Sequence, residues 1–332
     1  MRKDIEKVDK RITYFDVAKV LLIILVVLGH ILIILNPRYD KLFFSAIQAF
    51  IYTFHMPAFF IIHGTLFNNE KYKKICVKDF IVKRIYSLII PYLFFEVIGI
   101  VWKAIFCKQR LTEGLYYLIT IRCNVGADWF LIALFLGSLL FLLYVKYPNR
   151  VYGIVSAIVC FVLPMFLSGH QLIIIIGRGM LAYGFIMIGN IGKEWFRSEK
   201  TKSVLWLSTS LVITAIVAII SLKWAGNDFY TCTVDNPLTL VIGGISGTLL
   251  ILGLSRILHC KMITNIGNHT LTIMGTHQLV IYAMTAIIPA LYGGNIGGGV
   301  LLFGAIVLFE IPVVLLIDRY LPFFVGKGYR KR

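Results

Sequence analysis

Long apolar stretches separated by short polar segments dominate this chain. Ten stretches are long and apolar enough to form helices that cross a bilayer, whose core of about 30 Å takes about 20 helical residues. No connecting segment is large enough to fold as a soluble domain, so we expect any chemistry to occur within the helical bundle. The pattern predicts an all-α, polytopic membrane bundle of about ten transmembrane helices. Their approximate ranges are 15–35, 43–67, 85–106, 129–145, 151–168, 171–190, 203–222, 237–255, 266–291 and 298–317.

Composition and charge support this prediction and indicate an orientation. The 332 residues are 59% hydrophobic and 15% charged, with a formal net charge of +17. A basic chain can bind nucleic acid, but here the Lys and Arg residues are spread over short loops, as the positive-inside rule requires, and we predict no nucleic-acid partner. We expect both termini in the cytoplasm, with 1–14 and 318–332 as basic cytoplasmic ends of one integral-membrane domain, 1–332. This orientation leaves few basic residues outside: Arg38, Lys41, Lys108, Arg110, Arg122 and Lys223.

The first predicted helix carries an acid, a base and a histidine. Ionisable side chains are costly inside a bilayer, so they usually face the protein interior and mark a functional path. Lys19 and His30 project from nearly the same side of the helix, about three turns and about 16 Å apart. Asp16 falls one turn before Lys19 and can pair with it. Arg11 precedes the helix at what we expect to be its cytoplasmic end.

Further polar residues interrupt the later apolar segments. His55 lies close to Pro57, which lacks a backbone N–H and therefore frees a carbonyl. Asp128 and Trp129 open the fourth predicted helix at the outer surface. Arg178 lies within the sixth predicted helix, where its guanidinium must pair with an acid or bind an anion such as a phosphate. Isolated structural hydrogen bonds would not need so many titratable side chains. We therefore expect the following residues to line one polar cavity: His30, His55, Arg178, His277 and Glu310.

Less specific interpretations stand beside these. A lone histidine can form an ordinary hydrogen bond between helices, Pro57 can be a packing kink, and Trp129 can be an interfacial anchor. Glu96 and Glu310 could each be neutral or pair with Arg178 or a histidine, and the sequence does not assign the pairs. The six cysteines are scattered without a C-x-x-C pair, so we predict no metal site.

Several motifs resemble the membrane-bound acyltransferase 3 family, in particular its branch of fucose 4-O-acetylase-like and related sugar O-acetyltransferases. The resemblance covers nearly the whole chain, and the ten-helix count also fits it. One departure is His63-Gly64, where the family more often has Ser-Gly. The motifs are Arg11-x4-Asp16-x2-Lys19-x10-His30, Phe54-His55-Met56-Pro57-x-Phe59-Phe60, Lys83-Arg84-Ile85-x4-Ile90-Pro91-Tyr92, Trp129-Phe130-Leu131, and the segment from Ile266-Gly267-Asn268-x-Thr270-Leu271 through His277.

The resemblance implies transfer of an acyl group, most often acetyl, from acyl-CoA to a hydroxyl of a cell-envelope glycan or lipid-linked sugar. The donor enters from the cytoplasm, the acceptor comes from the membrane or the outer side, and the protein is multi-pass in a cell membrane, the cytoplasmic membrane of a bacterium. Acyl-CoA is then a co-substrate, and we expect no bound cofactor. Our catalytic candidates are His30, Asp16, Lys19 and His55, and our candidates for binding acyl-CoA or the acceptor are Arg11, Asp128, Trp129, Arg178, His277 and Glu310.

The chemistry of the residues suits this implication. An alcohol is a poor nucleophile near neutral pH, and a neutral imidazole can take its proton during attack on a thioester, a task for which His30 is our candidate. A covalent acyl-histidine is a second route. The main alternative is a multi-pass transporter or flippase for a sugar-linked or anionic substrate, but the internal repeats typical of transporters are not evident. A membrane scaffold or sensor would not need ionisable residues at ordered spacing.

Overall fold

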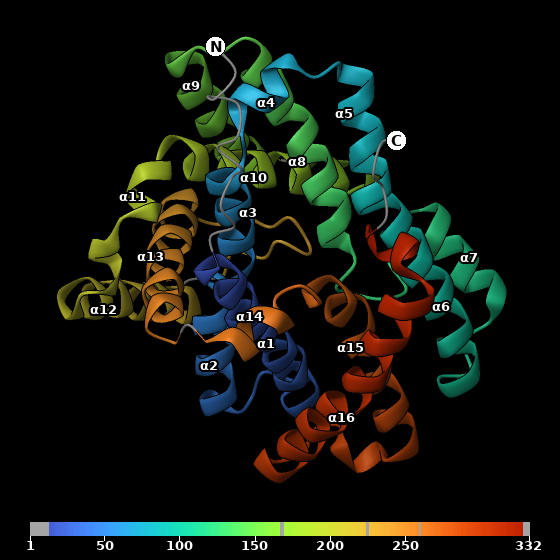
Figure 1. Cartoon of the computed structure of the whole chain (residues 1–332). Coiled ribbons are helices and arrows are strands. Elements are labelled where there is room, and N and C mark those ends of the chain that lie inside the picture. Colours follow the sequence, from blue (N-terminus) through green and yellow to red (C-terminus); the bar gives the residue numbers. More distant parts are fainter. Residues whose placement is uncertain (1–12, 167–168, 224–225, 259, 328–332) are drawn as a thin grey trace.

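The computed structural model describes residues 13–166, 169–223, 226–258 and 260–327, which fold almost entirely into helices (Figure 1). The all-α prediction is confirmed. The longer helices are α1 (Tyr14–Leu35), α2 (Leu42–Tyr52), α3 (His55–Leu66), α6 (Ile90–Phe106), α8 (Trp129–Lys146), α9 (Arg150–Val162), α10 (Gln171–Ile191), α12 (Val204–Lys223), α13 (Pro237–Ile257), α15 (Thr270–Ile287) and α16 (Ile296–Tyr320). Shorter helical elements are α4 (Asn69–Lys74), α5 (Val77–Arg84), η1 (Ile85–Ile89), α7 (Leu111–Ile119), η2 (Leu163–Phe166), α11 (Lys193–Arg197), η3 (Glu199–Lys202), α14 (Lys261–Ile266), η4 (Pro289–Leu291) and η5 (Pro322–Val325).

Eight helical segments within the described residues are long and apolar enough to cross a membrane. The other two predicted spans also form helices, but α9 with η2 is shorter, and α15 is not among the eight. Three polar residues follow one another within α15: Thr276, His277 and Gln278. The polytopic bundle is therefore confirmed, while the count of ten crossings stays a prediction.

Two predicted spans contain irregular backbone. The segment predicted over 43–67 is broken at Thr53 and Phe54 into α2 and α3. Pro57 is the third residue of α3, where its missing N–H costs no hydrogen bond within the helix. The third span begins earlier than predicted, at Val77, and passes through the π-helical turn η1 into α6. Such irregularities inside membranes are often found at functional sites, because they leave backbone groups free to bind polar partners.

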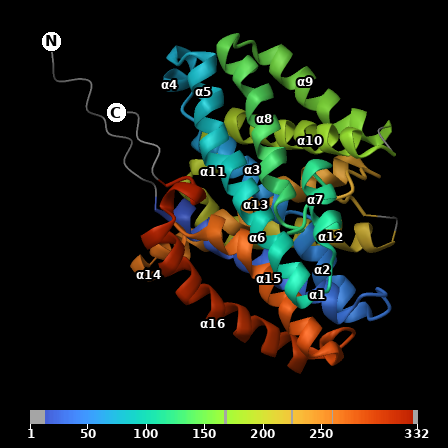
Figure 2. The ribbon, with the colours of Figure 1, turned by 90° about the vertical axis from the view of Figure 1, so that its right-hand side faces the viewer.

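The helix ends collect on two opposite sides of the bundle (Figure 2). On one side, the start of α1 at Asp16 packs against Gly267, and His269 pairs with Asp318 near the end of α16 at 2.8 Å. On the other side, Lys41 donates to two carbonyls of the loop between η4 and α16. The start of α1 and the end of α16 thus share a side, as the predicted orientation requires. That this side is cytoplasmic stays a prediction.

A close helix crossing joins α3 and α10, and it depends on glycine. α10 packs along both α8 and α3. Gly64 of α3 faces the carbonyl of Ile186, and Gly189 of α10 faces the carbonyl of Ile61. A Cβ at either glycine would collide with a backbone oxygen, which cannot move aside as a side chain can. Small residues let the two backbones approach closely, which is how membrane helices gain packing energy without a hydrophobic driving force.

We expect Gly189→Ala to destabilise the folded bundle by about 1–3 kcal/mol, because the new methyl group forces the two backbones apart. The measurement is the midpoint temperature of unfolding in detergent, determined from the amount of folded protein that size-exclusion chromatography detects after heating. Gly304→Ala is the matched control, since nothing lies within 4 Å of a Cβ at that position of α16. Equal midpoints for the two variants would show that the crossing tolerates a Cβ.

Candidate active site

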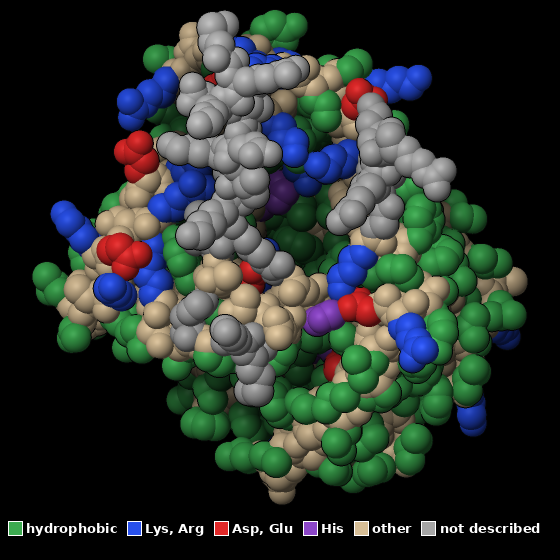
Figure 3. Space-filling model, in the orientation of Figure 1, with side chains coloured by type: hydrophobic (Ala, Val, Ile, Leu, Met, Phe, Trp, Pro, Cys, Tyr) green, Lys and Arg blue, Asp and Glu red, His purple; other side chains and the backbone are tan. Residues whose placement is uncertain are grey.

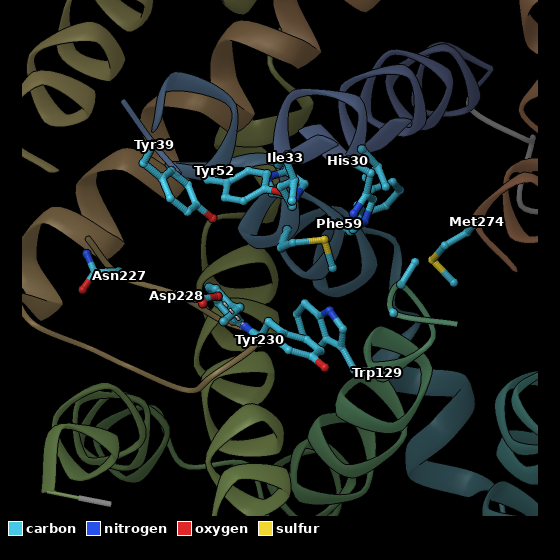
Figure 4. Close-up of a pocket in the computed structure, with 16 residues that line it drawn as sticks. His30, Ile33, Tyr39, Tyr52, Phe59, Trp129, Asn227, Asp228, Tyr230 and Met274 are labelled. Atoms are coloured by element: carbon cyan, nitrogen blue, oxygen red, sulfur yellow. Dashed lines mark hydrogen bonds between the residues drawn. The ribbon is translucent and has the colours of Figure 1, made fainter. Parts of the chain in front are cut away.

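A cavity of about 260 Å³ lies where α1, α3 and α8 meet the loops before α2 and before α13. Figure 4 shows His30, Tyr39 and Tyr52 on one side of this cavity, and Asp228, Tyr230 and Trp129 on the other. The cavity thus brings two of the predicted histidines to one place, with aromatic rings and polar loop residues around them. The other lining residues are Val26, Ile33, His55, Met56, Phe59, Gly126, Ala127, Asn227, Phe229 and Met274.

His30 projects from α1 into this cavity, with its ring centroid 5.2 Å from that of His277 on α15. The Gln278 side-chain nitrogen lies 2.9 Å from Nδ1 and 3.1 Å from Nε2 of His30. An amide N–H can only donate, so it needs a ring nitrogen with a free lone pair, which imidazolium lacks. The contact therefore fits a neutral His30, and neutral imidazole is the form that accepts a proton.

Gln278 connects His30 to two other elements. Its side-chain oxygen accepts hydrogen bonds from the backbone N–H of Ala127 at 3.1 Å and from the hydroxyl of Tyr282 at 3.2 Å. These two donors fix the orientation of the amide, so its nitrogen must face the histidine. The sequence analysis missed Gln278. The available signal was an amide beside His277 within an otherwise apolar helix.

The two other histidines of the group are oriented by their own helices. Nδ1 of His277 bonds to the carbonyl of Ile273 at 2.8 Å, and Nδ1 of His55 bonds to that of Ile51 at 2.9 Å. A carbonyl can only accept, so Nδ1 carries a proton in both rings, and in the neutral ring Nε2 keeps its lone pair. Nε2 of His277 has no hydrogen-bond partner within the described residues, although this side chain is completely buried. The Ile51 carbonyl also accepts from the N–H of Phe54 at 3.3 Å, so it binds both sides of the break between α2 and α3.

The loop before α8 enters the interior and is held there by Glu96. One carboxylate oxygen of Glu96 accepts from the backbone N–H of Asn124 at 2.6 Å and from its side-chain amide at 3.0 Å, and the other accepts from the N–H of Val125 at 3.1 Å. Glu96 is completely buried. Its partners are therefore the N–H groups of this loop, and not Arg178 or a histidine. The loop in turn places Gly126 and Ala127 at the wall of the cavity.

Asp128 and Trp129 follow this loop and are more buried than expected. Asp128 is completely buried, and neither of its carboxylate oxygens has a hydrogen-bond partner within the described residues. Burial, with a smaller contribution from the charge of Glu96, raises the pKa of the Asp128 carboxyl well above its usual range. A protonated carboxyl can donate a hydrogen bond. Trp129 stacks on Phe229 at 6.1 Å and lines the cavity, so it is not an interfacial anchor.

Arg178 and Glu310 do not share the cavity of His30, contrary to our expectation of a single polar site. The Arg178 guanidinium donates to the carbonyl of Tyr230 and lies over the ring of Trp129 at 5.4 Å, so it lines a neighbouring polar cavity. Glu310 lies on the far side of α15, beside an apolar cavity of about 410 Å³ between α1 and α16. Its carboxylate accepts from the Thr276 hydroxyl at 2.8 Å. The cavity of His30 and the apolar cavity beside Glu310 lie on opposite faces of α15. Helix periodicity predicts which residues of α15 share a face, but not which other helix that face contacts.

The charged pair at the start of α1 has the predicted geometry. Nζ of Lys19 lies 3.2 Å from a carboxylate oxygen of Asp16, and the acid is buried while Lys19 is about one third exposed. Both lie on the side of the bundle opposite to the loops that line the His30 cavity. Arg11 lies outside the described residues.

A basic group accompanies this pair on the same side of the bundle. In Figure 3, Lys and Arg side chains surround a hollow in the face turned to the viewer. The guanidinium of Arg84 lies 3.3 Å from Nε2 of His63. A guanidinium can only donate, so Nε2 of His63 accepts and the ring is neutral. Arg84 is further packed against the ring of Phe80 at 5.0 Å. His63, which marks the departure from the motif, is therefore the hydrogen-bond acceptor of Arg84.

Comparison with known families agrees with this arrangement. The family model for the acyltransferase domain of the acyltransferase 3 type matches residues 12–318. The chain belongs to the acyltransferase 3 family. The matched model describes an acyltransferase domain, and the apolar spans of this chain are long enough to cross a membrane. The matched region contains every site candidate of the described residues together with all eight of the apolar spans, apart from the last two residues of α16.

Two similar proteins carry the name Nodulation protein NolL. The one from Sinorhizobium fredii is 31% identical over 223 residues, which are 65% of this chain and 58% of that protein. The one from Mesorhizobium japonicum is 31% identical over 148 residues, 43% of this chain and 38% of that protein. The chain thus matches less than two thirds of the length of either relative. No solved structure matches the chain significantly.

Proposed function

We propose that this protein transfers an acetyl or similar short acyl group from acyl-CoA to a hydroxyl of a cell-envelope glycan or lipid-linked sugar, in the cytoplasmic membrane of a bacterium. The observation that carries the proposal is the hydrogen bond from the Gln278 amide to His30, which fits a neutral imidazole, at the wall of a small cavity. A neutral imidazole in a cavity that admits a hydroxyl is the arrangement that general-base catalysis needs.

In the proposed reaction, the acceptor hydroxyl displaces the Gln278 N–H from the single lone pair of the neutral His30 ring. His30 then takes the proton of this hydroxyl while the hydroxyl oxygen attacks the thioester carbonyl carbon. The carbon–sulfur bond then breaks, and the imidazolium of His30 returns the proton to the departing thiolate. The products are the O-acyl ester and free CoA, so no other reactant is needed. The alternative route through an acyl-histidine uses the same groups, and Nε2 of His55 and of His277 are then further nucleophile candidates because their lone pairs are free.

The donor is proposed to enter from the side of the bundle where α1 begins. Lys19 and Arg84 are the cations there, and cations of this kind bind the phosphates of CoA. His63 is the neutral acceptor that helps to orient Arg84. Asp16 holds the Lys19 side chain in place. The distance along α1 from Lys19 to His30 is about 16 Å, which the extended pantetheine arm of CoA can span.

The acceptor is proposed to reach the cavity from the opposite side. The rings of Trp129, Tyr39 and Tyr52 offer flat apolar surfaces for a sugar ring, and Asn227 adds a polar group to the wall. The Asp128 carboxyl follows the lining residue Ala127 and precedes the lining residue Trp129, and its oxygens have no hydrogen-bond partner among the described residues. It is proposed to bind a sugar hydroxyl. The cavity is too small for a complete CoA molecule, so only the acyl end of the donor would enter it.

The proposal predicts that the purified protein in nanodiscs releases CoA from radiolabelled acetyl-CoA and transfers the label to a cell-envelope glycan extract. Label should remain on the glycan after extraction and be released by mild base, as an O-ester is. Parallel incubations with succinyl-CoA test the size of the acyl group. If the folded protein bound no acyl-CoA and released none of the CoA, the donor assignment would be wrong.

A further inference from the structure

A second polar cavity, of about 380 Å³, adjoins the cavity of His30. The two share Gly126 and Tyr230 in their walls. Three basic residues from three different parts of the fold line the second cavity: Lys103 near the end of α6, Arg122 in the loop after α7, and Arg178 in α10. The remaining lining residues are Tyr117, Cys123, Gln171, Ile174, Thr231 and Tyr282.

The three cations of this cavity are not paired with acids. None of the ion pairs of the described residues includes Lys103, Arg122 or Arg178. Lys103 instead lies over the ring of Tyr282 at 4.6 Å, and Arg122 lies over that of Tyr116 at 5.4 Å. Arg178 binds only a backbone carbonyl and two aromatic rings. Three unpaired cations around one cavity leave a positive potential that attracts an anion.

Three acids near this cavity are already occupied. Glu96 binds the loop before α8, as described above, and Glu113 accepts from the Tyr117 hydroxyl at 2.9 Å. Asp228 accepts from the backbone N–H of Tyr230 at 2.7 Å and from the Thr231 hydroxyl at 3.0 Å. These bonds hold the carboxylates within their own loops, so the guanidinium and ammonium groups keep donors for a ligand.

The cavity is also connected to the reaction centre. Tyr282, which Lys103 covers, donates to the side-chain oxygen of Gln278, and the nitrogen of the same amide contacts His30. A ligand in the basic cavity would therefore be linked to the proposed base through the hydrogen bonds of Tyr282 and Gln278.

We propose that this basic cavity binds an oxyanion, a phosphate or a carboxylate, carried by the acceptor glycan close to the hydroxyl that is acylated. The assignment of the anion to the acceptor rests on the proposed function. The anion site itself is inferred from the lining of the cavity and does not depend on that function. Guanidinium groups bind phosphate and carboxylate oxygens in pairs, and an ammonium group adds a point charge. The acceptor would then be an acidic or phosphate-linked sugar, and neutral sugars would be poor substrates.

Anion binding can be tested without any turnover. The midpoint of thermal unfolding of the purified protein is measured with inorganic pyrophosphate, glucuronate or neutral methyl glucoside at constant ionic strength, with CoA present to occupy the donor site. A ligand that binds the folded protein raises this midpoint. We expect pyrophosphate or glucuronate, but not methyl glucoside, to stabilise the protein, and the stronger of the two identifies the phosphate or the carboxylate. Arg122→Gln and Lys103→Gln should each weaken this binding about tenfold or more.

Arg110→Gln is the matched control, because Arg110 is an exposed arginine at the start of α7 that does not line the cavity. It should bind as the wild type does. Equal stabilisation of the wild type and all three variants, or none by either anion, would overturn the anion site. If the anions bind at this cavity but do not compete with the glycan extract in the labelled-transfer assay, the site stands and its assignment to the acceptor is wrong. If the protein bound the anions but transferred no acyl group, the proposed acyl transfer would be wrong and the anion site would stand.

Discussion

Replacing His30 by glutamine should lower the rate of acyl transfer by about 10²–10⁴-fold, because the side chain that takes the proton of the acceptor hydroxyl is lost. Glutamine is close to histidine in size and can still bond to Gln278, so the cavity should keep its shape. The measurement is label transfer from radiolabelled acetyl-CoA by protein in nanodiscs, together with the affinity for acyl-CoA. We expect the rate to fall while the affinity for the donor stays near that of the wild type.

His170→Asn is the control for this experiment. His170 is exposed at the start of α10, where Nδ1 accepts from the N–H of Leu172, and asparagine can cap the helix in the same way. It should transfer label at the rate of the wild type. A folded His30→Gln protein with normal turnover would exclude His30 as the base, and attention would then pass to His55 and His277.

Replacing Glu96 by leucine should destabilise the protein by about 3–5 kcal/mol and abolish acyl transfer. Leucine leaves the buried N–H groups of Asn124 and Val125 without acceptors, and each unsatisfied buried donor is costly. The loop would then leave its place, and Ala127 would no longer hold the oxygen of Gln278. The unfolding midpoint in detergent and the rate of label transfer measure the two effects.

Glu113→Gln is the matched control for Glu96, because Glu113 is an exposed carboxylate that binds only the Tyr117 hydroxyl. It should change the unfolding midpoint little. Glu96→Gln, which keeps the shape and one acceptor oxygen, should fall between the wild type and Glu96→Leu. A Glu96→Leu protein as stable as the control would show that the loop is held by other contacts.

The first helix shows how much of the site its own sequence predicts. The pairing of Asp16 with Lys19 is a contact between residues three apart, which helix geometry dictates and the structure confirms. The exposure of His30 to a polar environment likewise follows from the cost of burying an imidazole in lipid. Its partners do not follow, because Gln278 lies 248 residues further along the chain.

The separation of Arg178 and Glu310 shows the corresponding failure. Both were assigned to the cavity of His30 because each is an ionisable residue within a predicted span. The structure places Glu310 on the other side of α15 and Arg178 behind Trp129, beside the loop before α13. A hydropathy pattern reports that a residue must avoid lipid, but several interior surfaces of a bundle satisfy that condition equally well.

The sequence by itself determined the helical membrane architecture and the acyltransferase 3 motifs, which the family match bears out, because crossing a bilayer and presenting a histidine on a helix are properties of short, continuous segments. Only the tertiary structure decided which polar residues are neighbours: His30 with Gln278 and His277, Glu96 with the loop before α8, and three unpaired cations around a second cavity. These contacts arise from the packing of helices that are distant in the chain, and glycines at their crossings set the distances.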